Sequence, residues 1–254
     1  MNTIRTVYAL LLCFLGIATL RGASDGNTVV TTDGVTIAVK TIVRPHAQKI
    51  VVFCHGLGDN KDSIAHILTS KGLFADANLY IFDFRGHGKS TGRSTRGIHE
   101  WRDIQAVMRH VHKINRHTKF PVYGIGISMG GAALMKAVAH GSRFNKIVVD
   151  SAYADLYTVA KEAVNLKYVP KMVCNWFCGG DTCSVNIAHY GNKIKIPVLI
   201  LHSNTDTLIQ MHHAHTIRDA ISTSELVVIT GVPHAGILTM TDVYSMTIAS
   251  FLSQ

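Results

Sequence analysis

The sequence has no long run of charged residues and no low-complexity tract, and only 5 of its 254 residues are proline. These absences exclude a disordered or a fibrous protein. Hydrophobic residues make up 47% of the chain and charged residues 16%, and the length suits one α/β domain better than two. The sequence therefore predicts one globular domain with a sizeable core.

Motifs typical of nucleic-acid binding are also missing. We find no basic cluster interleaved with aromatic residues, no helix-turn-helix and no zinc-finger spacing, so we expect no nucleic-acid partner. The chain carries 25 Lys and Arg against 16 Asp and Glu, a formal net charge of +9. Because a basic surface favours anionic partners such as acidic lipid head groups, peripheral contact with an anionic membrane stays open.

An apolar stretch lies near the N-terminus, at residues 7–20. It is shorter than the roughly 17 to 25 residues that span a bilayer as a helix, and small residues follow it. This pattern is typical of a signal peptide with cleavage near Ser24, and an uncleaved membrane anchor is the alternative. We therefore expect residues 1–24 to direct export and residues 25–254 to form a secreted or periplasmic domain.

Four cysteines follow the predicted signal peptide: Cys54, Cys174, Cys178 and Cys183. Cys54 lies in an apolar run and is expected to be a small buried residue of a strand. The other three lie within ten residues, and an oxidising compartment would permit one disulfide and one free thiol among them, with the pairing open. Since no CxxC pair is present, we expect no metal site there.

Segments with strand and helix patterns alternate along the chain. Residues 28–32 and 35–43 flank Asp33-Gly34, a two-residue turn signal that predicts an antiparallel hairpin. Six further short apolar runs suit buried strands, at residues 49–55, 78–84, 121–127, 146–151, 197–203 and 225–229. Helical periodicity covers residues 62–71, 98–115, 130–140, 211–220 and 243–252. The sequence therefore predicts an α/β fold, with an eight-stranded, mostly parallel sheet and helices on both faces.

One interval, at about residues 155–195, interrupts this alternation. It is apolar, and connections of this length in compact domains are usually functional. It also follows the carboxyl end of a strand, where open α/β sheets bind ligands. We therefore expect a small cap inserted into the domain; a structural excursion held by a disulfide is the alternative.

The most specific motif is Gly126-Ile127-Ser128-Met129-Gly130, which directly follows a predicted strand and directly precedes a helical segment of small residues. A nucleophilic serine stands on such a strained turn, and the flanking glycines leave room for it. The helix N-terminus also directs free N–H groups toward a developing oxyanion. The motif predicts Ser128 as nucleophile and the Met129 amide as one oxyanion donor.

A second oxyanion donor is expected, because a single N–H rarely stabilises a tetrahedral intermediate. His55-Gly56-Leu57-Gly58 ends a predicted strand, and a turn there would bring the Leu57 amide beside that of Met129. For His55 itself we favour a structural role, bonding the backbone of this loop.

A serine needs a general base and an acid that orients it. Of the 15 histidines, His234 lies in a loop bounded by Gly and Pro after the last predicted strand, so we predict it as the base. Asp206 follows the penultimate strand and is the predicted acid, whereas Asp150, at the end of an earlier strand, ranks second. Asp219 and Asp181 are better explained by solvation or capping.

Taken in order, these motifs resemble the α/β-hydrolase superfamily, in the branch of monoacylglycerol lipases and serine aminopeptidase-like hydrolases, over about residues 29–252. The residues that carry the resemblance are His55-Gly56-Leu57-Gly58, Asp83-Phe84-Arg85-Gly86-His87-Gly88-Lys89-Ser90, Gly126 to Gly130, Asp206 and His234. The resemblance implies an α/β-hydrolase fold, a Ser128–Asp206–His234 triad and an oxyanion hole at Leu57 and Met129. It also implies that Arg85 to Ser90 form a structural turn.

The predicted function is that of an exported serine hydrolase of carboxylic esters, acting on a short acyl ester, lysolipid or thioester without a cofactor or metal. A serine aminopeptidase or acyl-peptide hydrolase is the alternative, and it would need an acidic site for the substrate amine, with Glu162 and Asp181 as candidates. A non-catalytic binding protein on the same scaffold is the second alternative. His212 and His215 suggest a metal site, but we expect surface histidines there, because no carboxylate lies on their helix face.

Overall fold

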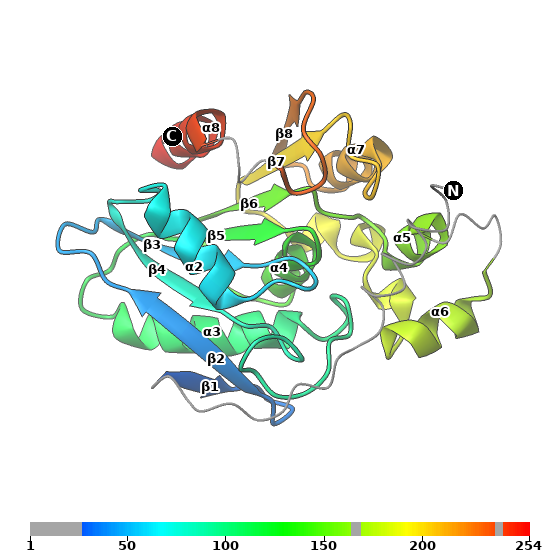
Figure 1. Cartoon of the computed structure of the whole chain (residues 1–254), viewed down its shortest axis with the longest axis horizontal. Helices are drawn as coiled ribbons and strands as arrows, with labels where there is room; N and C mark the ends of the chain where they lie inside the picture. Colours follow the sequence, from blue (N-terminus) through cyan, green and yellow to red (C-terminus); the bar gives the residue numbers. More distant parts are fainter. Residues whose placement is uncertain (1–26, 164–168, 237–240) are drawn as a thin grey trace.

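The computed structural model describes residues 27–163, 169–236 and 241–254, so the predicted signal peptide lies outside the described residues. Eight strands form one sheet in the order β1-β2-β4-β3-β5-β6-β7-β8 (Figure 1). They are β1 (Thr28–Val30), β2 (Thr36–Ile42), β3 (Lys49–Cys54), β4 (Ala77–Phe82), β5 (Val122–Ile127), β6 (Lys146–Asp150), β7 (Val198–Ser203) and β8 (Ser224–Ile229). Strand β2 pairs antiparallel with β1 and β4, and all other pairs are parallel, which confirms the predicted hairpin and sheet.

Helices cover both faces of this sheet, as predicted. They are α2 (Lys61–Ser70), α3 (Trp101–Ile114), α4 (Met129–Ala139), α5 (Leu156–Ala163), α6 (Lys171–Cys178), α7 (Met211–Ala220) and α8 (Thr241–Ser253). Buried residues of α3, α4 and α7 belong to one core cluster, and those of α2 and α8 to the other. Along β3 the side chains alternate between the two clusters: Ile50 and Val52 join the first, and Val51 and Phe53 the second. This alternation is why the strand is apolar throughout. None of the described helices is long and apolar enough to cross a bilayer.

The segment between β6 and β7 contains α5, α6 and three short 3-10 turns: η1 (Thr182–Ser184), η2 (Ile187–His189) and η3 (Gly191–Lys193). Helices α5 and α6 lie beyond the carboxyl ends of the central strands (Figure 1). On α6, Cys174 and Cys178 are buried, while Met172 and Trp176 are 78% and 75% exposed. The large apolar side chains therefore mark the solvent side of this helix.

The prediction of a disulfide among the clustered cysteines is wrong, because Cys174, Cys178 and Cys183 are all free thiols. Cys174 and Cys178 lie four residues apart on one helix. That spacing holds Cβ atoms about 5 to 6 Å apart, whereas a disulfide requires about 3.5 to 4.5 Å. The helix itself thus keeps this pair from bridging.

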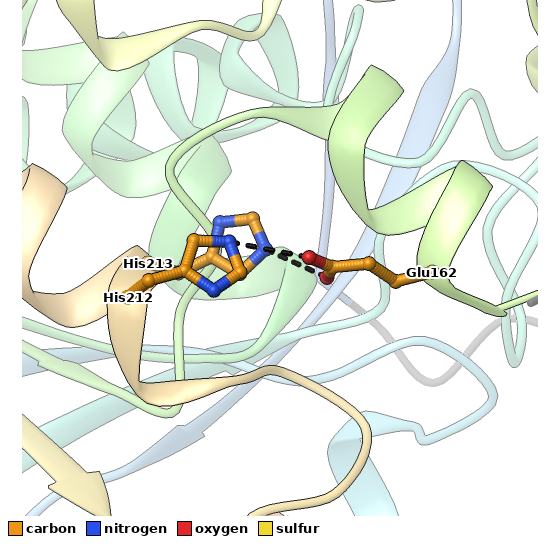
Figure 2. Close-up of side chains that lie close together, drawn as sticks. All are labelled: Glu162, His212 and His213. Atoms are coloured by element: carbon orange, nitrogen blue, oxygen red, sulfur yellow. Dashed lines mark hydrogen bonds and ion pairs between the residues drawn. The ribbon is translucent and has the colours of Figure 1, made fainter. Parts of the chain in front are cut away.

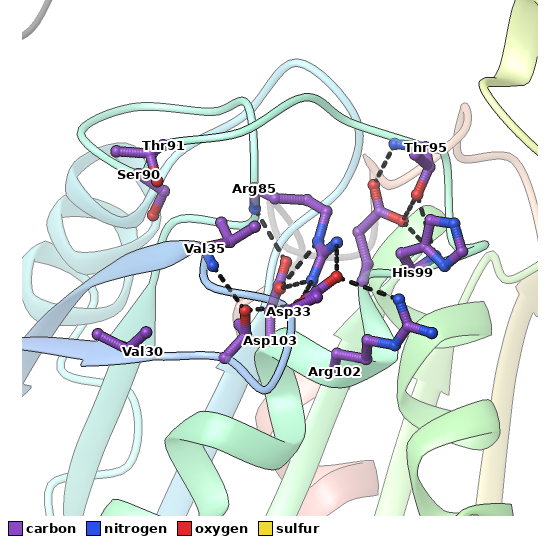
Figure 3. A network of polar contacts seen from close by, with 12 residues as sticks. Val30, Asp33, Val35, Arg85, Ser90, Thr91, Thr95, His99, Arg102 and Asp103 are labelled. Carbon is purple, nitrogen blue, oxygen red and sulfur yellow. Dashed lines mark hydrogen bonds and ion pairs between the residues drawn. The ribbon is translucent and has the colours of Figure 1, made fainter.

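Arg85 ties the β1–β2 turn to the first turn of α3. Its guanidinium lies 2.8 Å from Asp33 Oδ2 and 2.7 Å from Asp103 Oδ1 (Figure 3). The hydrogen bond from Arg85 holds the pKa of the Asp33 carboxyl well below its usual range, against the opposing effect of partial burial. The turn at Arg85 therefore has a structural role, and it fixes the loop that runs toward the predicted oxyanion site.

Candidate active site

Ser128 occupies a strained turn between β5 and α4. Its backbone has φ 51° and ψ −118°, a conformation that costs a non-glycine residue about 1 to 3 kcal/mol. The flanking glycines let the chain pack tightly around it: a Cβ on Gly126 would lie 2.7 Å from Gly130 O, and one on Gly130 would lie 2.2 Å from Cys54 O. The sheet and helix thus hold a partly buried serine at the end of β5.

The structure brings Ser128 together with His234 and Asp206. His234 Nε2 lies 3.0 Å from Ser128 Oγ, and His234 Nδ1 lies 2.7 Å from Asp206 Oδ2. Since a carboxylate can only accept, Nδ1 carries the proton and Nε2 accepts from the serine hydroxyl. The three side chains follow the carboxyl ends of β5, β7 and β8, so the parallel sheet converges them from distant parts of the chain.

Asp206 is built to remain ionised. Burial alone would raise the pKa of its carboxyl, but hydrogen bonds from His234 and from two backbone amides outweigh burial and hold that pKa below its ordinary value. Those amides, of Leu208 and Ile209, each lie 2.9 Å from Asp206 Oδ1. One carboxylate oxygen is thereby fixed by the loop, and the other is directed at the imidazole.

The loop that carries His234 is anchored by a residue that the sequence analysis did not identify. Thr205 Oγ1 donates to Val232 O at 2.8 Å, which ties the loop after β7 to the loop after β8. The sequence carries no signal for this contact, because a threonine hydroxyl beside an aspartate is equally typical of any surface turn.

Asp150, the second-ranked acid, forms no hydrogen bond with His234 among the described residues. Its carboxyl is fully buried, accepts from Ser151 Oγ at 2.9 Å through Oδ1, and has no partner at Oδ2 among the described residues. Burial raises the pKa of Asp150 to about 7. The structure therefore joins Asp206, and not Asp150, to the imidazole.

The raised pKa of Asp150 predicts a pH-dependent stability. From about pH 4 to pH 7 the unfolded chain releases this proton while the folded chain keeps it, so the free energy of unfolding falls as pH rises. Asp150→Asn removes the effect, and we expect wild type to lose about 3 kcal/mol relative to this variant between pH 5 and pH 8. Urea unfolding at both pH values measures the difference. Asp219→Asn, at an exposed site, is the control. If the free energies of unfolding of wild type and Asp150→Asn differ by the same amount at pH 5 and at pH 8, the prediction is contradicted.

The two predicted oxyanion donors face the same region. An added Cβ on Gly56 would lie 3.7 Å from Ser128 Cβ, which places the Gly56-Leu57 turn beside the serine. Within the described residues, the amides of Leu57 and Met129 donate to no backbone acceptor. Both N–H groups are therefore available to an oxygen that develops charge at Ser128.

His55 holds this turn rather than taking part in proton transfer. Its Nδ1 donates to Gly56 O at 2.7 Å, and its Nε2 accepts from Phe84 N at 3.0 Å. Burial is the main cause that lowers the pKa of His55 to about 4, so the ring is neutral. His87 Nε2 accepts from Gly58 N at 3.2 Å and completes the support. The backbone-bonding role expected for His55 agrees with these contacts.

His212 and His215 of α7 are exposed, as expected, but their helix has a carboxylate partner that the sequence analysis did not foresee. A carboxylate does reach this helix, from α5: Glu162 Oε1 lies 3.2 Å from His212 Nε2, and Glu162 Oε2 lies 3.1 Å from His213 Nε2 (Figure 2). His213 is moreover buried. The sequence could not show this pairing, because the partners lie about 50 residues apart.

These three side chains have metal-ligating types, with their ligand atoms within 4.8 Å of one another. However, His213 Nδ1 accepts from Ala154 N at 3.2 Å. Its Nε2 must then carry the ring proton and donate to Glu162, whereas a metal needs an unprotonated nitrogen. The cluster therefore fits a hydrogen-bonded link between α5 and α7 better than a metal site.

Sequence comparison finds one matching family model and two related curated proteins. Residues 45–167 match the family model described as serine aminopeptidase, S33, a range that contains Ser128 and ends before Asp206. A protein of Acanthamoeba polyphaga mimivirus, named as an alpha/beta hydrolase, is 25% identical over 187 residues, covering 72% of this chain and 64% of that protein. The uncharacterized protein YfhR of Escherichia coli K12 is 23% identical over 175 residues, 67% of this chain and 57% of its own length. The matches therefore span about three fifths of these curated relatives.

Solved structures share the fold over nearly the whole chain. The Pyrococcus furiosus esterase Pf2001 superposes with a TM-score of 0.72 at 23% identity, covering 93% of this chain and 97% of that one. Est1E from Butyrivibrio proteoclasticus, in a structure with ferulic acid bound, has a TM-score of 0.71 at 19% identity, covering 90% of this chain and 100% of that one. At these identities the likeness shows the fold.

Proposed function

Because the chain belongs to the α/β-hydrolase superfamily, we propose that it is a serine hydrolase that cleaves carboxylic esters through a Ser128–His234–Asp206 triad. The observation that carries this proposal is the continuous hydrogen-bonded path from Asp206 Oδ2 through the imidazole to Ser128 Oγ. The esterases among the fold relatives support the ester class, and ferulic acid in Est1E is compatible with it.

In the proposed reaction, Ser128 Oγ attacks the acyl carbon while His234 Nε2 takes the hydroxyl proton. Asp206 stabilises the imidazolium that forms, and the amides of Leu57 and Met129 donate to the oxyanion. His234 then returns the proton to the leaving alcohol, which leaves an acyl group on the serine. Water, activated by the same imidazole, attacks the acyl-enzyme and releases the acid. Besides substrate and water, these proposed steps use side chains and backbone amides of this chain.

The acidic residues of the segment between β6 and β7 give the aminopeptidase alternative less support than the triad gives ester hydrolysis. Both oxygens of Glu162 pair with histidines of α7. Asp181 Oδ1 accepts from Cys183 N and caps η1. Both oxygens of Glu162 are thus engaged, which disfavours it as an amine site, whereas Asp181 is exposed and uses Oδ1 in the cap. We therefore keep ester hydrolysis as the proposal, with residues 1–24 as the proposed export signal.

A fluorophosphonate probe tests the mechanism without requiring the natural substrate. We expect it to modify Ser128 in the full chain, as identified by peptide mass spectrometry, because the probe reports a serine that a histidine activates. His234→Ala is expected to slow labelling by about 10³-fold or more, and Ser142→Ala, in a remote turn, to leave it unchanged. Labelling of another residue would contradict Ser128 as the nucleophile, and no labelling of the folded protein would favour the non-catalytic alternative.

A further inference from the structure

A pocket of about 690 Å³ lies between α3 and the turn that joins α4 to β6. Its charged lining is entirely basic among the described residues: Arg109, Lys113 and Arg116 come from α3 and its end, and Arg143 comes from the turn. We call these four residues and their surroundings the α3 basic pocket. The like charges repel one another, so an anion between them would stabilise the arrangement.

The four cations have no ionic partner within the part of the chain that the structure describes. The ion pairs there involve other cations, such as Lys61 and Arg85. Ser142 also lines the pocket, and its Oγ is buried without a hydrogen-bond partner among the described residues. Phosphate oxygens accept hydrogen bonds from hydroxyl groups and from Lys and Arg side chains. The pocket offers both kinds of donor, and its Lys and Arg residues have no ion-pair partner among the described residues.

The segment that supplies these cations is basic, and four of its seven Lys and Arg residues line the pocket, whereas Lys136 donates to Ile98 O and Lys146 to Phe251 O. Residues 104–149 contain seven Lys and Arg residues and no Asp or Glu, in a chain whose formal net charge is +9. The dipole at the carboxyl end of α3 favours cations on its last turn. It does not account for Arg143, which lies on a separate segment and completes the pocket. The charge is therefore a local feature of this surface.

We propose that the α3 basic pocket binds phosphate groups, presented by an anionic lipid head group or by a soluble organic phosphate. A nucleic acid fits the pocket less well, because no Phe, Tyr or Trp is among the described residues that line it, and the His112 ring is hydrogen-bonded to Arg143 O. The volume of about 690 Å³ accommodates a compact head group.

This site is separate from the proposed hydrolytic centre. The pocket lies where α3 ends before β5 and where α4 ends before β6, at the amino edge of the sheet, whereas Ser128 follows the carboxyl end of β5. The six residues of β5 alone separate these edges by about 20 Å. Helices α5 and α6 lie at the carboxyl edge (Figure 1). A membrane bound at the pocket would leave Ser128 facing away from the lipid, so binding would localise the enzyme without presenting the bilayer as substrate.

Vesicle binding by the full chain tests the proposal. The probes are phosphatidylcholine vesicles with and without 20 mol% phosphatidic acid, soluble inositol hexakisphosphate, and a single-stranded oligonucleotide. Each cation near an anionic surface contributes about fivefold in affinity, so Arg116→Gln with Arg143→Gln should weaken phosphate binding about 25-fold. The matched control is Arg93→Gln with Lys171→Gln, which removes the same charge elsewhere. Thermal unfolding checks that all variants fold, and a soluble ester checks that hydrolysis is unchanged.

Binding to phosphatidic acid vesicles that the pocket variant weakens and the control retains supports the proposal with a lipid source. Binding of inositol hexakisphosphate alone, with the same dependence on the variant, supports it with a soluble source. The proposal is overturned if neither phosphate probe binds, or if both double variants weaken binding equally, which would indicate a diffuse charge effect. It is overturned also if the oligonucleotide binds more tightly than either phosphate probe.

Discussion

Replacing Ser128 with alanine is expected to lower kcat for hydrolysis of a soluble p-nitrophenyl ester by about 10⁶-fold. The proposed mechanism has one nucleophile, the hydroxyl that lies 3.0 Å from His234 Nε2. Without it no acyl-enzyme can form, and the oxyanion donors alone leave a residual acceleration of about 10³- to 10⁴-fold over water. Steady-state kinetics with metal-free, purified enzyme measures the loss.

Ser142→Ala is the control for this substitution, because it removes another serine hydroxyl at the opposite edge of the sheet. We expect this variant to retain wild-type kcat. The strained backbone at Ser128 costs an alanine as much as it costs the serine. We therefore expect Ser128→Ala to fold with stability close to that of wild type, which thermal unfolding can check. If Ser128→Ala keeps activity within tenfold of wild type, the proposed nucleophile is wrong.

The strands and the five helices that pack on them follow from the sequence for a clear reason. Their apolar residues face a buried layer, as with Ile50 and Val51, which enter the two opposite core clusters from neighbouring positions of β3. In helix α6, the large apolar side chains do not face the core. Its Met172 and Trp176 are exposed while Cys174 and Cys178 are buried, so periodicity of large apolar residues does not mark the face that packs.

The candidate site divides in the same way. Ser128, Asp206 and His234 are predictable because each follows a strand of one parallel sheet, and the carboxyl ends of such strands share an edge. The contacts that support them are not predictable. Glu162 meets His213 only because α5 folds back against α7, and no local pattern in either segment announces that packing.

Replacing Asp206 with asparagine is expected to lower kcat by about 10⁴-fold with little change in KM. An asparagine can keep the two amide contacts through its oxygen, so the loop shape persists. Its amide group, however, would present N–H donors to His234 Nδ1, and the imidazole would then place its proton on Nε2. In that tautomer Nε2 cannot accept the proton of Ser128. The same ester assay measures the loss, and the fluorophosphonate rate should fall in parallel.

Asp150→Asn is the matched comparison, since it makes the same change on the other buried carboxyl near the triad. With its pKa raised to about 7 by burial, Asp150 is largely protonated below neutral pH, and an asparagine reproduces that neutral form. We expect this variant to keep kcat within about tenfold of wild type at pH 6, because Asp150 makes no hydrogen bond to the imidazole. If Asp150→Asn instead lost about 10⁴-fold and Asp206→Asn stayed active, the acid would belong to β6, and the bond from Asp206 to His234 would have only a structural role.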